Sequence, residues 1–240
     1  MMNFDIQAFA RSICADKRTL EMFRTLVNYA YVRVVNYHNT GWHDARRFEN
    51  ELAYFSQHFS PVTPEDLDVF LADKKWTKPK PGLILGFYDG LRSQYDTLFP
   101  LLERYRMTGW FFLPAFFPDV PVGEQHKYAE AHQLLARDGR EHPDGRVALS
   151  WDEVRKLAEH HVICCHTGSH CRITRQSTDE EMRREIVDAK RRIEAQIGRR
   201  VRVFSWRGGE EYLYNLKAHK YFEEAEYSYV ASDLKIEKIH

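Results

Sequence analysis

Short, continuous apolar runs alternate along this chain with segments whose apolar residues recur at helical spacing. The runs cover residues 83–87, 110–113 and 162–165, and residues 201–204, which Arg202 interrupts, predict a further strand. Runs of this length without polar interruption are typical of strands that are covered on both faces. Strands of this kind, separated by amphipathic helices, predict an α/β protein with a parallel sheet, either closed into a barrel or open.

The remaining patterns complete this alternation. A β-branched run at residues 31–35 predicts a first strand, and residues 227–231 predict a last one. Helical spacing or helix-start signals mark residues 5–27, 48–59, 98–105, 150–160 and 177–197, and another helix begins near Thr63. Residues 115–147 predict a long excursion that is either functional or mobile. We therefore expect an N-terminal helical segment, residues 1–30, followed by a single domain over residues 31–240.

Charge excludes some classes of partner. The chain has 35 basic and 35 acidic residues, so no overall field attracts nucleic acid or an anionic membrane. The N-terminus has neither the apolar stretch of a signal peptide nor a spanning segment, which predicts a cytoplasmic protein without a membrane span. A neutral or locally recognised substrate fits this composition.

The four cysteines are Cys14, Cys164, Cys165 and Cys171. They show no C-x-x-C spacing, and three of them crowd into eight residues, so a disulfide framework is not expected. Buried cysteine usually behaves as a small hydrophobic residue, and we favour this interpretation over thiolate ligation of a metal.

Ligands and substrates of parallel α/β proteins lie at the carboxyl ends of the strands. Here those ends carry Asp89, the histidine pair His166 and His170, and residues 205–209. Two imidazoles and a carboxylate suit one divalent metal, zinc first and cobalt, nickel or iron as alternatives, and leave coordination positions open. Gly168 between the histidines predicts a tight backbone path. An H-x-x-x-H pair alone is a weak signal, and its position at a strand end strengthens it.

Two segments resemble motifs of the polysaccharide deacetylases, also called carbohydrate esterase family 4 or the NodB homology domain. LILGFYDG is similar to the first motif, TFDDG, and ICCHTGSH is similar to the second, in which Ser or Thr follows the first of two histidines, here H-T-G-S-H. VVNYHNTG, LFPLLERYRMTGWFFL and LSWDEVRKLAEH resemble neighbouring parts of the family, in the family's order. The resemblance implies a distorted (β/α) barrel of about seven parallel strands, with a metal held by Asp89, His166 and His170.

This sequence also departs from the family's pattern. Tyr88 stands at the position of the catalytic-base aspartate, and a phenol with a pKa of about 10 is poorly suited to accept a proton. FSWRGGEEY only partly matches the third motif. It makes Arg207 a second catalytic candidate and Trp206 and Glu210 candidates for substrate binding, although Arg207 and Glu210 also fit a surface ion pair, and Glu210 also fits a replacement base.

No segment between Tyr212 and His240 matches the family's last motifs, so the general acid stays unassigned. We expect the C-terminal part of the barrel to be incomplete: abbreviated, completed by a partner subunit in a homo-oligomer, or absent from this chain.

The resemblance favours a metal-dependent hydrolase of non-peptide carbon–nitrogen bonds that deacetylates an N-acetylated carbohydrate or a small N-acyl substrate. A second hypothesis is a catalytically impaired member that binds metal and carbohydrate without turnover. A third is a structural domain whose histidines are incidental.

Overall fold

The computed structural model describes residues 31–38, 41–134, 144–208, 216–232 and 235–239. The predicted N-terminal helical segment, residues 1–30, lies outside the described residues. The strands are β1 (Val32–Tyr37), β2 (Ser60–Pro61), β3 (Gly82–Tyr88), β4 (Gly109–Leu113), β5 (Val162–Cys165), β6 (Val203–Ser205), β7 (Tyr229–Ala231) and β8 (Ile236–Lys238).

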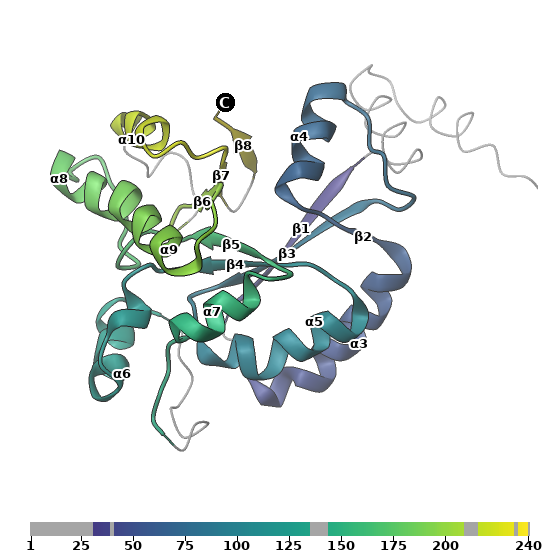
Figure 1. Cartoon of the computed structure of the whole chain (residues 1–240), viewed down its shortest axis with the longest axis horizontal. Coiled ribbons are helices and arrows are strands. Elements are labelled where there is room, and N and C mark those ends of the chain that lie inside the picture. The colour runs from purple at the N-terminus through teal and green to yellow at the C-terminus, as the bar shows by residue number, and fades with distance from the viewer. Residues whose placement is uncertain (1–30, 39–40, 135–143, 209–215, 233–234, 240) are drawn as a thin grey trace, which may run out of the picture.

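These strands form one curled sheet (Figure 1). Its order is β1-β3-β4-β5-β6-β7-β8, and β2 pairs with the beginning of β3. Every pair is parallel except the last, because β8 runs antiparallel to β7. The prediction of a mostly parallel, incomplete (β/α) barrel is therefore confirmed, with an antiparallel final strand that the sequence pattern did not indicate.

The alternation of side chains along β3 shows why its run is apolar throughout. Leu83, Leu85 and Phe87 enter the larger core between the sheet and its outer helices. Ile84 and Tyr88 point to the inner face of the half-barrel. Because both faces are covered, every residue of β3 is buried.

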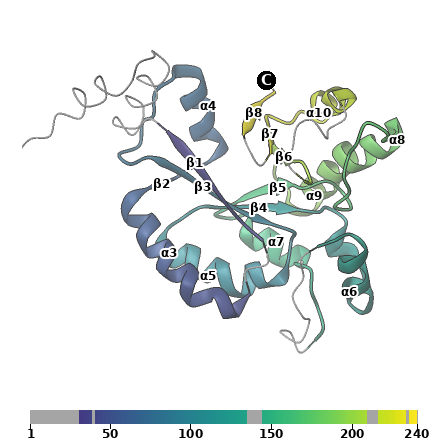
Figure 2. The same cartoon turned by 180° about the vertical axis from the view of Figure 1, so that it is seen from behind.

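The outer helices are α3 (Ala45–His58), α5 (Phe99–Tyr105), α7 (Trp151–Leu157) and α9 (Ala189–Ile197). Figures 1 and 2 show α3, α5 and α7 along one side of the sheet and α4 (Pro64–Asp73) on the other. Val62 and Leu67 bring the α4 region into the inner core. The sheet thus receives one helical layer outside and a smaller cover inside.

The predicted helix starts lie where the sequence placed them. Thr63 and Ser150 each accept a hydrogen bond from the backbone N–H three residues later, in complete capping boxes. A third capping box at Thr178 starts a continuous helical rod made of α8 (Asp179–Met182), the π-helical turn η5 (Arg183–Asp188) and α9. Gly198, at φ +65°, ends this rod.

The excursion between β4 and β5 contains a helix that its composition did not predict, α6 (Val122–Ala131). The last described helix, α10 (His219–Glu224), precedes β7. No helix among the described residues has the length and apolar character needed to cross a membrane. The cytoplasmic location and homo-oligomeric assembly stay predictions.

Candidate metal centre

Asp89, His166 and His170 meet at the carboxyl edge of the sheet. Asp89 follows β3 and His166 follows β5, and each of the three residues offers one ligand atom within 4.8 Å of the others. All three side chains are buried, and His170 Nε2 lies 3.4 Å from Asp89 Oδ1. The structure therefore brings together the three residues that the sequence predicts as ligands. Their binding of a metal stays a prediction.

Hydrogen bonds orient both imidazoles. His166 Nδ1 lies 3.1 Å from the Ser205 carbonyl oxygen, and His170 Nδ1 lies 2.8 Å from the His132 carbonyl oxygen. A carbonyl oxygen only accepts, so each Nδ1 carries the proton and donates it. This tautomer leaves Nε2 of each ring with a lone pair for a cation. In metal sites, the ligand histidine commonly donates its other ring N–H to an acceptor in the same way.

Burial also keeps these rings neutral. It places the pKa of His166 well below its ordinary value, with a further lowering by His170, and it lowers the pKa of His170 to about 4. A histidine must be deprotonated to bind a metal. The donor set and its protonation therefore fit a divalent cation at neutral pH.

The backbone at this site is strained. Asp89, Thr167 and His170 have φ values of +81°, +62° and +59°, in the left-handed region that L-residues rarely adopt. Such conformations persist only where the surroundings impose them, and they cluster at functional sites. The expected tight path is present, but Thr167 and His170 make it, not the intervening glycine.

Gly168 is needed for a different reason. A Cβ atom at this position would lie 2.2 Å from Cε2 of Phe116. The loop can approach the Phe116 ring only because residue 168 has no side chain.

A buried carboxylate supports the same loop. Glu185, on η5, accepts hydrogen bonds from the backbone N–H groups of Gly168 and Ser169 and from the Ser169 hydroxyl. Sequence reasoning missed this residue. The available signal was its spacing, three residues after Met182 and four before Ala189, which places a charge on the apolar stripe of the helical rod.

Tyr88, at the position that the resemblance assigns to the catalytic base, is only 5% exposed. Its ring stacks on Phe112, with centroids 4.4 Å apart, and on His38, with centroids 4.8 Å apart. Its edge contacts His166 at 5.1 Å between centroids. Tyr88 therefore lies in an aromatic stack beside the candidate ligands.

His38 follows β1 and is the exposed end of this stack. A positive charge on His38 lowers the pKa of His166 and of His170, so His38 interacts electrostatically with both candidate ligands. Sequence reasoning included His38 only as part of the Tyr-His resemblance and did not name it as a site residue. Only the fold shows that the end of β1 reaches the candidate metal centre.

Arg207 also interacts electrostatically with the two candidate ligand histidines. Its Nη2 donates to Gln133 Oε1 at 2.5 Å, and its charge lowers the pKa of both ligand histidines. Burial, followed by the charge of Arg172, lowers the pKa of Arg207 itself. Arg207 is thus close enough to the candidate ligands for its charge to act on them.

The other predicted site residues have different surroundings. Trp206 is 5% exposed and packs on Phe204 and Phe222 in the outer core. Glu210 lies outside the described residues, so its roles in binding substrate, pairing with Arg207 or replacing the base stay predictions.

Among the described cysteines, Cys164 and Cys165 are buried and Cys171 is half-buried. Burial raises the pKa of Cys165 and of Cys171 to about 12, and that of Cys164 well above its usual range. Thiols with such pKa values stay protonated at neutral pH and are poor metal ligands in this state. Cys14 lies outside the described residues.

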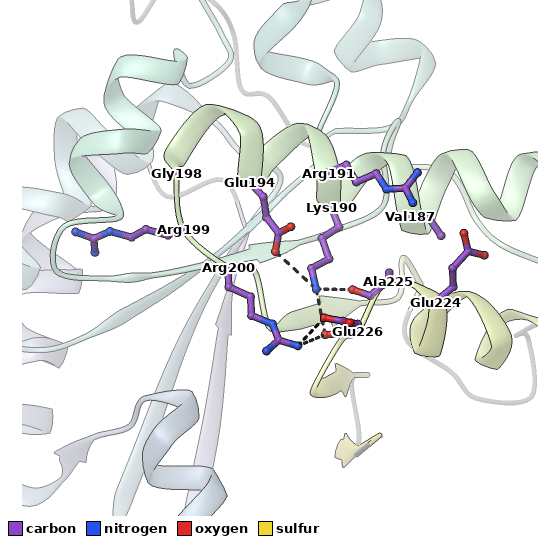
Figure 3. Close-up of a pocket in the computed structure, with 10 residues that line it drawn as sticks. All are labelled: Val187, Lys190, Arg191, Glu194, Gly198, Arg199, Arg200, Glu224, Ala225 and Glu226. Atoms are coloured by element: carbon purple, nitrogen blue, oxygen red, sulfur yellow. Dashed lines mark hydrogen bonds and ion pairs between the residues drawn. The ribbon is translucent and has the colours of Figure 1, made fainter.

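A separate hollow of about 500 Å³ lies at the opposite end of the sheet, where the chain enters β6 and β7 (Figure 3). Lys190 projects into it and donates to the carbonyl oxygens of Ala225 and Glu226, and Glu194 Oε1 lies 3.6 Å from its Nζ. Through these contacts Lys190 joins α9 to the backbone just after α10.

Several solved structures share this fold. The deacetylase PplD of Streptococcus pyogenes, solved in complex with acetate, is 14% identical, with 82% of this chain and 80% of that chain covered and a TM-score of 0.63. IcaB of Ammonifex degensii is 18% identical over 83% of this chain and 82% of that chain, with a TM-score of 0.60. A de-N-acetylase of Aggregatibacter actinomycetemcomitans is 19% identical over 87% of this chain and 88% of that chain, also with a TM-score of 0.60.

No curated protein sequence matches the chain significantly. The family model of polysaccharide deacetylase matches residues 75–230, which include the three candidate ligands and most of the sheet. The chain therefore belongs to the polysaccharide deacetylase family.

Proposed function

We propose that this protein is a metal-dependent hydrolase of non-peptide carbon–nitrogen bonds that removes acetyl groups from an N-acetylated carbohydrate. The observation that carries the proposal is the convergence of Asp89, His166 and His170, each buried, with both imidazoles oriented from behind by carbonyl oxygens. Membership of the deacetylase family supports the reaction class.

A divalent cation, zinc first, would be held by Asp89, His166 and His170. Two nitrogen donors and one carboxylate suit zinc, cobalt, nickel or iron and leave coordination positions open. When bound, the cation supplies the Lewis-acid chemistry for hydrolysis of an acyl group.

The chain's own residues supply charge and protons. Arg207, whose charge acts on the candidate ligand histidines, would stabilise the negative charge that develops on the acyl oxygen. His38, which is exposed and stacked on Tyr88, is the histidine that we assign to proton transfer, because it is near the centre and its ring is not a candidate ligand. Tyr88 orients His38 by stacking.

One observation favours a second function, the binding of metal and carbohydrate without turnover. Tyr88 is buried between His38 and Phe112 at the position that the resemblance assigns to the base. A phenol held in an aromatic stack does not replace a carboxylate that accepts protons. In this alternative Asp89, His166 and His170 still bind the metal, but the protein does not catalyse deacetylation.

Two measurements separate these functions. Zinc content and affinity are measured on protein purified without chelator, and acetate release from N-acetylglucosamine oligomers is measured with zinc or cobalt added. We expect stoichiometric zinc, a higher Tm with zinc than with a chelator, and acetate release. Zinc binding without acetate release, together with a Tyr88→Asp variant that gains turnover, would establish the alternative.

The role of His38 has its own test. We expect His38→Gln to reduce acetate release about 100-fold or more, the usual contribution of general acid–base catalysis. Zinc affinity should stay within about twofold of the wild-type value, because His38 is not a candidate ligand and its replacement removes no bond to the metal. His58→Gln, which changes another exposed histidine, is the matched control. Equal rates for the two variants would remove His38 from the mechanism.

A further inference from the structure

We propose that Glu185 is the positioning residue of the metal centre. It holds residues 166–170, here called the histidine loop, in the conformation that directs both imidazoles to Asp89. The inference rests on the proposed function, because it concerns how the same centre is assembled. Glu185 is not a candidate ligand and acts through the loop backbone.

The hydrogen bonds of Glu185 are directed at the middle of the loop, and Arg184 Nη1 lies 3.4 Å from its Oε1. Its Oε2 accepts the backbone N–H groups of Gly168 at 2.8 Å and Ser169 at 2.7 Å, and its Oε1 accepts the Ser169 hydroxyl at 2.8 Å. The carboxylate is 3% exposed. Hydrogen bonds to an ionised acceptor are stronger than neutral ones, and burial strengthens them further.

The loop needs such support because two of its residues are strained. Thr167 and His170 adopt left-handed conformations on either side of the two N–H groups that Glu185 binds. A left-handed conformation is unfavourable for an L-residue, because its Cβ then lies too close to the following carbonyl oxygen. Without restraint the loop would relax, and His170 would rotate away from Asp89.

A second set of hydrogen bonds restrains the opposite side of the loop. The Thr167 carbonyl oxygen accepts from the N–H of Ala115 at 3.0 Å, and the Gly168 carbonyl oxygen accepts from the N–H of Phe116 at 2.8 Å. The segment after β4 thus holds the loop carbonyl groups, while Glu185 holds its N–H groups. Together they leave the loop one backbone path.

The residue type indicates that this contact serves more than stability. Glu185 occupies the apolar stripe of the helical rod, where an apolar residue would avoid the desolvation of a charge. It also lies on a π-helical turn, an irregularity that often occurs at functional sites. A buried charge at this place is explained by the loop that it binds.

The test measures zinc affinity, by competition with a chromophoric chelator, on full-length variants shown by circular dichroism to be folded. We expect Glu185→Ala to weaken zinc binding about 10- to 100-fold, the usual effect of residues that orient metal ligands. Glu185→Gln, which keeps the shape and two acceptor sites but loses the charge, should lose several-fold. Glu180→Ala, an exposed residue of the same rod, is the control and should bind as the wild type does.

A spectroscopic measurement separates positioning from general destabilisation. The absorption bands of bound cobalt report its coordination geometry, so Glu185→Gln should change their intensity, whereas a merely structural role would leave them unchanged. Ser169→Ala in the Glu185→Ala background should cause no further loss of zinc affinity, because both changes remove the same contact.

If Glu185→Gln binds zinc with wild-type affinity and shows wild-type cobalt bands, the proposal is overturned. This test remains decisive even if Glu185→Ala does not fold. The result is independent of turnover, because a wild-type chain that binds zinc but releases no acetate refutes the hydrolase and leaves the Glu185 comparison intact. A wild-type chain that binds no zinc would overturn both.

Discussion

Burial sets the protonation of several histidines in this chain. It lowers the pKa of His170 to about 4 at the candidate metal centre and does the same to His161 at the other end of the sheet. His161 Nδ1 accepts the backbone N–H of Gly109, and its ring contacts Phe99 and Phe111. Glu103, which favours the charged form, offsets only part of this effect. In the folded protein at neutral pH, His161 is therefore uncharged and accepts the hydrogen bond from Gly109.

His161 predicts a pH dependence of stability. Its pKa is 6.5 when unfolded and about 4 when folded, so between these values the unfolded chain binds more protons. Its contribution to the free energy of unfolding is therefore complete above pH 6.5 and is lost as the pH falls towards 4. We expect this loss to be on the order of 2–3 kcal/mol.

Urea unfolding of metal-free protein at pH 7, 5.5 and 4.5 measures this loss. His161→Asn keeps an acceptor for Gly109 and cannot titrate, so its unfolding free energy should depend less on pH than that of the wild type. The control is His126→Asn, which changes an exposed histidine of α6 that is not among the groups acting on the pKa of His161, and the slope should stay unchanged. Parallel curves for wild type and His161→Asn would contradict the prediction.

At the scale of the element, the helix ends show how local sequence defines the boundaries. The rod that begins at Thr178 ends at Gly198, where glycine adopts φ +65° without steric cost. The helix α4 begins in the capping box of Thr63 and ends at Lys74, which adopts φ 53° with a full side chain. One end of α4 is therefore optimised and the other is strained.

Lys74→Gly should stabilise the protein. Glycine relieves the left-handed strain, and we expect the free energy of unfolding to rise by about 0.5–1 kcal/mol, as measured by urea titration. Ala72→Gly, at an exposed position inside the same helix, should have the opposite sign and lose up to about 1 kcal/mol. A loss of stability in both variants would show that Lys74 contributes contacts that outweigh its strain.

At the scale of the whole molecule, the sheet is a half-barrel with β1 and β8 as its edges. Polar contacts tie α4, which comes early in the chain, to strands near its end. Arg202 Nη2 lies 2.9 Å from Asp68, and the Tyr229 hydroxyl donates to the same carboxylate at 2.6 Å. Asp68 is thus bound across the inner face to Arg202 and Tyr229, which lie 134 and 161 positions after it in the chain.

These contacts predict coupling between the two ends of the chain. We expect Asp68→Ala to lower the free energy of unfolding by about 1–2 kcal/mol, because it removes hydrogen bonds to a charged acceptor. In a double-mutant cycle, Tyr229→Phe should cost less in the Asp68→Ala background than in the wild type. Replacement of Asp73, an exposed acidic residue of the same helix, by alanine is the control. Strictly additive effects would show that the link contributes nothing.

Much of the architecture was predictable from local sequence. Apolar runs marked β3, β4 and β5, and capping residues marked the starts of α4 and α7, because periodicity and caps act within a few residues of one another. The convergence of Asp89 with His166 and His170 followed from the rule that parallel strands share a carboxyl edge. That rule needs no distances, only the order of strands and helices.

The sequence alone therefore determined the fold class, the positions of β3, β4 and β5, and the identity of the three candidate ligands. Only the tertiary structure decided that Glu185 clamps the histidine loop, that His38 and Phe112 enclose Tyr88, and that β8 runs antiparallel. Each of these depends on which distant segments become neighbours and how each helix is rotated against the sheet. Such contacts join residues far apart in the chain, so no local pattern records them.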